Sequence, residues 1–225
     1  MSEARIDEHI EELKSRLKHS VIVFVLLSSI SLYFSPGILS FIQNDLGVKL
    51  HSLAAYDVVY TEIQIALILG IVSSLPVFYI QFLGFLKPGL RAREYRILRN
   101  YLPLSIVLFC AGSVFAYNFI VKAALEFFSS SAASTEIIAV WGLKNTLSFV
   151  LKISSFTGVM FQLPIAALVL SKAGLLDRKM MKDYRRYFII LVMFLAAVVT
   201  PPDIISQILL VLPVLVLYQI SIYLV

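Results

Sequence analysis

Residues 62–86, EIQIALILGIVSSLPVFYIQFLGFL, decide the fold class of this chain, because Glu62 is the only charged residue in the stretch. An α-helix needs about 20 consecutive apolar residues to cross a hydrocarbon core of about 30 Å. Lipid offers the backbone no hydrogen-bonding partners, so a spanning segment is either a helix or part of a closed barrel. The stretch lacks the short alternating pattern of barrel strands and therefore predicts a transmembrane helix.

Similar apolar runs lie on both sides of this stretch, and no repeat or low-complexity linker divides the chain. Hydrophobic residues make up 60% of the 225 positions and charged residues 15%, whereas soluble domains are about half apolar and a quarter charged. We predict an all-α, polytopic membrane protein that forms a single domain over residues 1–225. Its six expected transmembrane helices are residues 20–34, 62–86, 101–121, 147–170, 187–199 and 204–225.

The distribution of Lys and Arg residues predicts the orientation in the membrane. Residues 1–19, the loop after the second span and the loop after the fourth span hold four, five and six of the 19 Lys and Arg residues. The alternate loops hold only Lys49, Lys122 and Lys144, while Lys152 lies near the outer end of the fourth span. Loops rich in Lys and Arg stay in the cytoplasm, so both termini are predicted to be cytoplasmic. The net charge of +5 then reflects orientation and not nucleic-acid binding.

The segment before the first span is predicted to be an amphipathic helix that lies along the membrane surface. Ile10, Leu13 and Leu17 recur in it at helical spacing. A cleaved signal peptide is the alternative interpretation of the run 20–34. Against it, the preceding segment carries five acidic residues where a signal peptide is basic, and residues 35–37 form a poor cleavage site.

The last two spans are predicted to form a short hairpin. Residues 187–199 extend only about 20 Å at a rise of about 1.5 Å per residue, which is less than the bilayer core. The connection Thr200-Pro201-Pro202-Asp203 is too brief to emerge fully into water, so the hairpin turns near the outer leaflet or the bilayer thins around it. Asp203 either only caps the sixth helix or also takes part in function.

The amino-terminal helix carries a candidate binding face. His9, Glu12 and Arg16 lie at positions i, i+3 and i+7 and share that face. The simplest interpretation is an exposed Glu12–Arg16 ion pair, which contributes only about 0.2–0.5 kcal/mol. The alternative is that these side chains bind a ligand at the cytoplasmic surface.

The loop after the second span carries a second candidate. Pro88 is expected to end the span, and Phe85 and Leu86 lie just before it. Glu94 is the only acidic residue among the five basic residues of this loop. It either pairs with Arg91 or presents a carboxylate near the amino-terminal helix for a cationic ligand.

A third candidate lies inside the fourth span. Gln162 is costly at membrane depth unless it faces other helices or a watery cavity, and Pro164 is expected to bend the helix. Helix–helix hydrogen bonding and a polar cavity are both open interpretations of Gln162. Cys110 has no second cysteine to pair with, and the three histidines are dispersed, so the sequence predicts no disulfide, metal site or cofactor.

Five segments, taken in order, resemble the TatC family and together cover essentially the whole chain. They are His9-x-x-Glu12-Leu13-x-x-Arg16, Phe85-Leu86-x-Pro88-Gly89-Leu90-x-x-x-Glu94, Phe115-Ala116-Tyr117 through Phe127, Phe156-x-Gly158-x-x-Phe161-Gln162-x-Pro164, and Thr200-Pro201-Pro202-Asp203 with Ser206, Gln207 and Pro213. The chain departs from the family pattern at Lys14, Asp57, Tyr95, Lys122 and Gln162, where Arg, Glu, a basic residue, Pro and often Glu are usual.

The resemblance implies a function. TatC proteins, with TatA- and TatB-type single-span partners, export folded proteins across the cell membrane of prokaryotes, driven by the proton-motive force, and they recognise twin-arginine signal peptides. By this resemblance the chain is not an enzyme and assembles into homo- and hetero-oligomers. The implied signal-peptide site comprises Glu12, Glu94, His9, Arg16, Phe85, Leu86 and Pro88, and the implied membrane polar or partner site comprises Gln162, Pro164 and Asp203.

Two other classes of membrane protein are weaker interpretations. A small-solute secondary transporter would show repeated halves with interrupted helices and ionisable residues at mid-membrane, but the halves of this sequence differ. An intramembrane enzyme would need a His-Glu-x-x-His pair, a Gly-x-Ser-x-Gly element or paired membrane aspartates, none of which occurs in the sequence.

Overall fold

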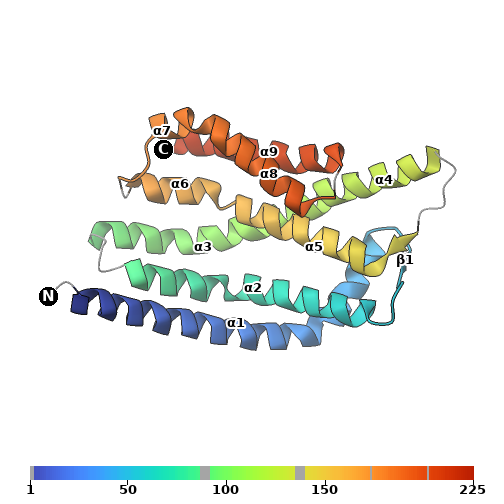
Figure 1. Ribbon diagram of the computed structural model, residues 1–225, viewed down its shortest axis with the longest axis horizontal. Helices are drawn as coiled ribbons and strands as arrows, with labels where there is room; N and C mark the ends of the chain where they lie inside the picture. The colour runs from blue at the N-terminus through green and yellow to red at the C-terminus, as the bar shows by residue number, and fades with distance from the viewer. Residues whose placement is uncertain (1–2, 87–91, 135–139, 173, 202) are drawn as a thin grey trace. The chain divides into compact units, whose positions relative to one another are not determined.

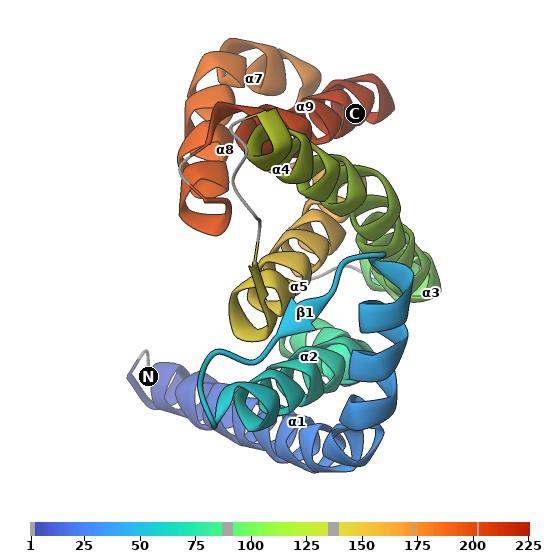
Figure 2. The same cartoon turned by 90° about the vertical axis from the view of Figure 1, so that its right-hand side faces the viewer.

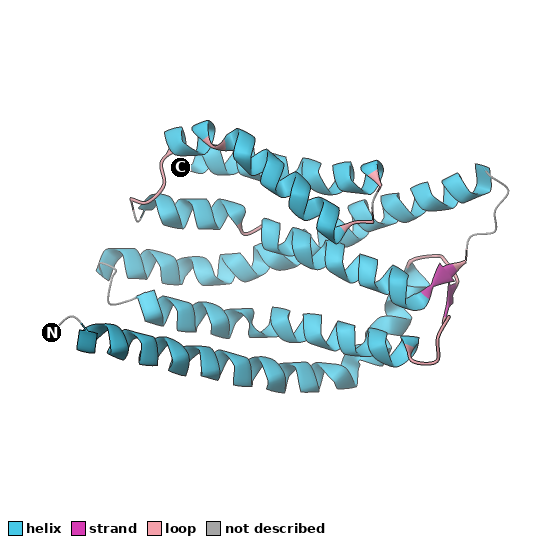
Figure 3. Cartoon of the chain, in the orientation of Figure 1, coloured by secondary structure: helices cyan, strands magenta, loops and turns pink. Residues whose placement is uncertain are grey.

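The computed structural model describes residues 3–86, 92–134, 140–172, 174–201 and 203–225 (Figure 1). Within these ranges nearly every residue is helical, and the only strands, β1 (Leu50–His51) and β2 (Trp141–Gly142), form a short parallel ladder (Figure 3). The chain divides into two compact units, one of residues 1–39 and 62–106 and one of residues 40–61 and 107–225. The single domain expected from the sequence stays a prediction.

The first unit contains most of α1 (Glu3–Asp45) and α2 (Asp57–Leu86), which lie side by side, and the beginning of α3 (Ala92–Phe115) (Figure 1). Where the chain enters the membrane stays a prediction. α1 is one helix, with no end between the predicted surface helix over 1–19 and the predicted span over 20–34. It continues through Pro36, which cannot donate to the carbonyl of Leu32. The hydroxyl of Ser35 donates to that carbonyl at 2.8 Å and replaces the missing hydrogen bond.

The helix that contains the third predicted span, 101–121, is longer than the span at both ends. The helical path begins at α3, passes through a π-helical segment, η2 (Ala116–Val121), and ends with α4 (Lys122–Ser134). The apolar stretch does not reveal these helix ends, because polar turns continue the helix beyond it. Such π-helical segments within α-helices are often found at functional sites.

The fourth span is interrupted where the sequence predicted a bend. It consists of α5 (Leu143–Met160) and α6 (Leu163–Lys172), separated by Phe161 and Gln162. Pro164 lies in the first turn of α6, where a helix does not need its backbone donor. A Cβ atom on Gly112 of α3 would lie 2.6 Å from the ring of Phe161, so this glycine lets α3 approach the break closely.

The remaining helices are α7 (Arg178–Asp183), α8 (Arg185–Val199) and α9 (Ile204–Leu224). The predicted short fifth helix is confirmed, since α8 has 15 residues. The predicted sixth span, 204–225, coincides with α9, which has 21 residues and is long enough to cross a bilayer, so only its description as short is not kept. Among the described residues five helical segments are long and apolar enough to span a membrane, and α8 is not one of them.

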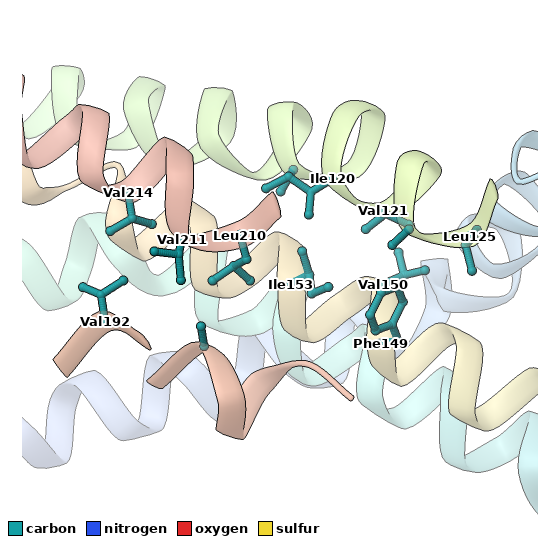
Figure 4. Close-up of a cluster of buried hydrophobic side chains, with 13 residues drawn as sticks. Ile120, Val121, Leu125, Phe149, Val150, Ile153, Val192, Leu210, Val211 and Val214 are labelled. Atoms are coloured by element: carbon teal, nitrogen blue, oxygen red, sulfur yellow. The ribbon is translucent and has the colours of Figure 1, made fainter. Parts of the chain in front are cut away.

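The core of the second unit lies where η2, α4, α5, α8 and α9 meet (Figure 4). Its members are small or branched apolar residues: Ala116, Ile120, Val121, Ala124, Leu125, Phe149, Val150, Ile153, Val192, Ala196, Leu210, Val211 and Val214. Lipid tails are as apolar as these side chains, so close packing and not the hydrophobic effect holds such helices together. This packed group positions the break between α5 and α6 and the turn before α9.

Candidate functional site

The Glu12–Arg16 pair predicted from the sequence is present on α1. Oε1 of Glu12 accepts hydrogen bonds from Nη2 of Arg16 at 2.8 Å and from Nε at 3.0 Å. The two side chains are about one-third exposed, 34% for Glu12 and 31% for Arg16. Hydrogen bonds between two ionised groups are stronger than neutral ones, so this carboxylate oxygen is a demonstrated acceptor for a guanidinium.

Arg16 also connects α1 with the end of α2. Its Nη1 donates to Oε1 of Gln81 at 3.2 Å. Gly84 lies one helical turn further along α2, and a Cβ atom there would meet the guanidinium of Arg16. Phe85, the next residue, is half-buried. The structure therefore brings three of the predicted signal-peptide residues, Glu12, Arg16 and Phe85, to the same region of the first unit.

The other predicted members of this site lie outside what the structure describes. His9, Leu86 and Glu94 belong to α1, α2 and α3, but their side chains are not among those described. Pro88 lies outside the described residues altogether. The distance between the Glu12 and Glu94 carboxylates therefore stays a prediction.

The predicted membrane polar site centres on the break between α5 and α6. Gln162 is half-buried, its backbone N–H donates to Val159 at 3.0 Å and its carbonyl accepts from Ala166 at 2.9 Å. Within one to two helical turns before it, the hydroxyl oxygens of Ser154 and Thr157 are buried and have no hydrogen-bonding partner in the described part of the chain. Such groups are normally satisfied by protein or ordered water, so the region is polar and incompletely bonded.

Asp203 caps α9, as one interpretation of the sequence predicted. Its Oδ2 accepts a hydrogen bond from the backbone N–H of Ser206 at 2.7 Å. A side chain in this position satisfies a backbone donor that has no partner within the helix. Its other oxygen, Oδ1, is buried and has no partner among the described residues. The cap is thus confirmed, and a further role of Asp203 stays open.

The sequence analysis missed a polar cluster at the carboxyl end of α1. Oδ2 of Asp45 accepts a hydrogen bond from the Tyr117 hydroxyl at 2.7 Å and lies 2.9 Å from Nζ of Lys122. The Lys122 ammonium also lies 5.4 Å from the centre of the Tyr117 ring. The only signal in the sequence was Lys122, which stands where the family commonly has Pro, and nothing in it named the distant partner Asp45.

Comparisons with known proteins decide the family. The profile of the family described as Sec-independent protein translocase protein (TatC) matches residues 8–213. The chain belongs to the TatC family. A TatC protein of Listeria innocua is 33% identical, over 95% of this chain and 88% of the relative. A TatC protein of Aquifex aeolicus is also 33% identical, over 97% of this chain and 93% of the relative.

Solved structures confirm the TatC fold. A crystal structure of the twin-arginine translocase receptor TatC matches with a TM-score of 0.85 and 33% identity, over 96% of this chain and 97% of that one. A second crystal structure, in the detergent DDM, matches with a TM-score of 0.87 and 32% identity, over 96% of this chain and 98% of that one. The chain is therefore a multi-pass membrane protein of protein transport and not an enzyme. The solute-transporter and intramembrane-enzyme alternatives are set aside.

Proposed function

We propose that this TatC protein, as the signal-peptide receptor of the twin-arginine translocase, binds the two arginines of the signal with the carboxylates of Glu12 and Glu94. The observation that carries the proposal is that Glu12 already holds a guanidinium, through two hydrogen bonds from Arg16 to one oxygen. An arginine of the signal peptide would make the same kind of contact. Glu94, on α3, supplies the second carboxylate by the family's pattern.

Arg16 is the internal competitor of the incoming arginine. When a signal arginine takes over the Glu12 carboxylate, Arg16 keeps an acceptor in Gln81, to which it already donates at 3.2 Å. The exchange then leaves no buried cation without a partner, which would otherwise be costly. In this proposal the Glu12–Arg16 pair closes the empty site, and Gln81 keeps Arg16 close while the site is filled.

The proposed site favours arginine over lysine. A guanidinium is planar and donates several hydrogen bonds in fixed directions, whereas an ammonium cannot reproduce that geometry. A hydrogen bond to a charged group contributes about 1.5–3 kcal/mol, so the two carboxylates together strengthen binding of the arginine pair roughly a thousandfold, and a lysine pair keeps only the part that does not need the guanidinium geometry.

The apolar stretch of the signal peptide is proposed to occupy a groove on the same unit. The groove has a volume of about 520 Å³ and an apolar lining that includes Leu27, Phe34 and Leu69, with Ser31, Gly37 and Ser73 among its small residues. Leu27 follows Arg16 by 11 positions, which is about 16 Å along a helix. A peptide whose arginines lie at Glu12 reaches the groove with the apolar residues that follow them.

The test is photocrosslinking of a signal peptide that carries the photoreactive group beside its Arg-Arg pair. Glu12→Gln and Glu94→Gln should each lower the yield about tenfold or more while the protein stays folded in the membrane. The matched control is Glu11→Gln, which removes the same charge from an exposed neighbouring position on α1. Equal yields from Arg-Arg and Lys-Lys peptides on the unmutated protein would refute the proposal.

We propose six spans with both termini in the cytoplasm. This count takes α8 as a span that is about 22 Å long at about 1.5 Å per residue, in a locally thin bilayer. The orientation rests on the Lys and Arg distribution. Single cysteines placed at residues 18 and 52 of a Cys110→Ser protein should react with a membrane-impermeant reagent from opposite sides. Labelling of both from the same side would overturn the topology.

We propose that the α5–α6 break contacts a single-span TatA- or TatB-type partner during export of folded proteins. The support is the polar character of Gln162 and the unbonded hydroxyls of Ser154 and Thr157 beside it. Hydrogen bonds between membrane helices contribute about 0.6–2 kcal/mol each. Gln162→Leu should weaken copurification of the partner without lowering signal-peptide crosslinking. Unchanged copurification and export would remove Gln162 from the proposal.

A further inference from the structure

The α7–α8 region carries a fixed group of five cations that the signal-peptide site does not use. They are Arg178, Lys179, Lys182, Arg185 and Arg186, all of them exposed. Within the described parts of the chain, none of the five forms an ion pair with a carboxylate. Of the two acidic residues nearby, Asp177 is engaged as the cap of α7, where its Oδ1 accepts from the N–H of Met180 at 2.6 Å.

The backbone places these cations on one side of a nearly continuous helical path. Tyr184, between α7 and α8, donates its N–H to Met180 at 2.9 Å and accepts from the N–H of Phe188 at 3.1 Å. At about 100° per residue the five cations fall within a stripe about 120° wide. Met181 and Phe188, seven residues apart, lie outside this stripe, beside its Arg185 edge.

The side of this path next to the stripe is anchored to α9. Met181 is buried, and its carbonyl accepts a hydrogen bond from the Tyr218 hydroxyl at 2.7 Å. The Phe188 ring stacks on the Tyr218 ring with their centres 3.9 Å apart. The carboxyl-terminal part of α9 therefore fixes α7, which lies beside that end of the chain (Figure 2). The cation stripe lies beside this anchor, and its five side chains stay exposed.

Aromatic side chains accompany the cations. The Arg178 guanidinium lies 5.4 Å from the centre of the Tyr223 ring, and the Arg186 guanidinium lies 4.8 Å from that of Tyr187. Tyr184, Tyr187 and Tyr223 are each more than half exposed. Exposed tyrosines together with Lys and Arg are typical of the level of the lipid headgroups.

We propose that the stripe formed by Arg178, Lys179, Lys182, Arg185 and Arg186 binds the headgroups of anionic phospholipids in the cytoplasmic leaflet. The leaflet assignment rests on the orientation given under the proposed function. The orientation of a membrane protein depends only on how many Lys and Arg residues its loops contain. It does not require that they be unpaired, aligned on one side and held by a buried anchor. Basic groups at this depth attract anionic lipids, each residue strengthening binding by a factor of about 5.

The test uses the full-length protein in nanodiscs of equal parts phosphatidylglycerol and phosphatidylcholine. Lipids that stay bound after transfer into detergent are counted by native mass spectrometry. The unmutated protein should retain phosphatidylglycerol preferentially. Lys179→Gln with Lys182→Gln, and separately Arg185→Gln with Arg186→Gln, should each lower that preference about tenfold or more.

Two matched variants control for loss of positive charge in general. Lys14→Gln with Lys18→Gln, on α1, and Arg96→Gln with Arg99→Gln, on α3, remove the same numbers of exposed Lys and Arg residues. They should leave the lipid preference unchanged. Equal losses in the control and test variants would overturn the proposal, because total charge would then explain the binding.

Two further measurements separate the proposal from neighbouring explanations. Inorganic phosphate at 20-fold excess over lipid should not displace phosphatidylglycerol, and displacement would show a phosphate-ion site instead of a lipid site. Cysteine labelling of each variant reports its orientation independently of lipid retention. An inverted protein that still retains phosphatidylglycerol would refute the cytoplasmic leaflet while leaving the binding surface in place. Loss of retention in a correctly oriented, signal-binding protein supports the surface directly.

Discussion

The two ends of α1 each hold a carboxylate bound to a cation, but the partners come from different distances along the chain. Glu12 and Arg16 are four residues apart on one helix. Asp45 is held by Lys122 and by Tyr117, which is 72 residues away. A pair within one helix can open without moving other elements, whereas a pair between distant elements opens only when they separate. The first arrangement suits exchange with a ligand, and the second suits fastening of α1 to η2.

The largest expected effect is at the Glu12–Arg16 pair, the contact that we expect to exchange with the ligand. Glu12→Gln should weaken binding of an Arg-Arg signal peptide by about 10- to 150-fold, because a hydrogen bond to a charged group contributes about 1.5–3 kcal/mol. The free energy of unfolding should change by less than about 0.5 kcal/mol, since an exposed i, i+4 pair stabilises a helix only slightly. Fluorescence anisotropy of a labelled peptide measures the binding, and Glu11→Gln is its control. If Glu12→Gln lowered stability but left peptide binding intact, the Glu12–Arg16 pair would be a structural contact and not an exchangeable one.

The opposite pattern is expected at the carboxyl end of α1, where Asp45 fastens the helix to η2. Asp45→Asn should lower the free energy of unfolding by more than a control substitution does, because the charged acceptor shared by Tyr117 and Lys122 is lost, but only slightly, because both side chains of the ion pair are partly exposed. Unfolding in mixed micelles measures this change. Peptide affinity should stay within about twofold. Glu126→Gln on α4, an exposed acidic residue, is the control. An affinity loss equal to that of Glu12→Gln would show that both ends serve the ligand.

A third carboxylate sharpens the comparison because its partner is a backbone group of its own helix. Asp203→Ala should lower the free energy of unfolding by about 0.5–1 kcal/mol through loss of the α9 cap. Asp203→Asn should change it by only a few tenths of a kcal/mol, because asparagine caps nearly as well as aspartate. If Asp203→Asn abolishes export while stability is kept, the carboxylate has a role beyond capping.

The smallest effect is expected from the residue that supports Arg16. Gln81→Leu removes a hydrogen bond of 3.2 Å from Arg16 and leaves the contacts with Glu12 in place. Peptide affinity should fall less than about fivefold, because Gln81 acts on the peptide only through Arg16 and its hydrogen bond contributes about 1 kcal/mol or less. A loss as large as that of Glu12→Gln would mean that Gln81 itself contacts the signal peptide.

Local signals predicted much of the fold. The apolar runs located the helices, and Pro164 and the Thr200–Asp203 connection marked the break and the hairpin turn that the structure contains. The continuation of α1 through Pro36 was not predicted, because the compensating hydrogen bond of Ser35 depends on a rotamer that the sequence does not reveal. The bounds of α9 were predicted to within one residue, because the proline turn and the uninterrupted apolar run mark both ends.

The candidate site was predictable only where its contacts are local. Glu12 and Arg16 follow from helical spacing, and they form the expected pair. The contact of Arg16 with Gln81 crosses 65 positions, and that of Tyr117 with Asp45 crosses 72. Such contacts depend on which faces of two helices meet, which hydrophobic periodicity does not specify in a membrane because both the lipid and the core are apolar.

The π-helical geometry of η2 has a consequence for how this chain tolerates insertions and deletions. Each i→i+5 turn holds one residue more than the matching α-helical turn, so η2 shifts the phase of everything after it by about 100°. Deleting one residue between Ala116 and Val121 would restore an unbroken α-helix from α3 into α4. The same deletion would rotate Lys122 away from Asp45 or the α3 face away from Phe161. The extra residue is therefore what lets one helix satisfy two neighbours that lie out of phase.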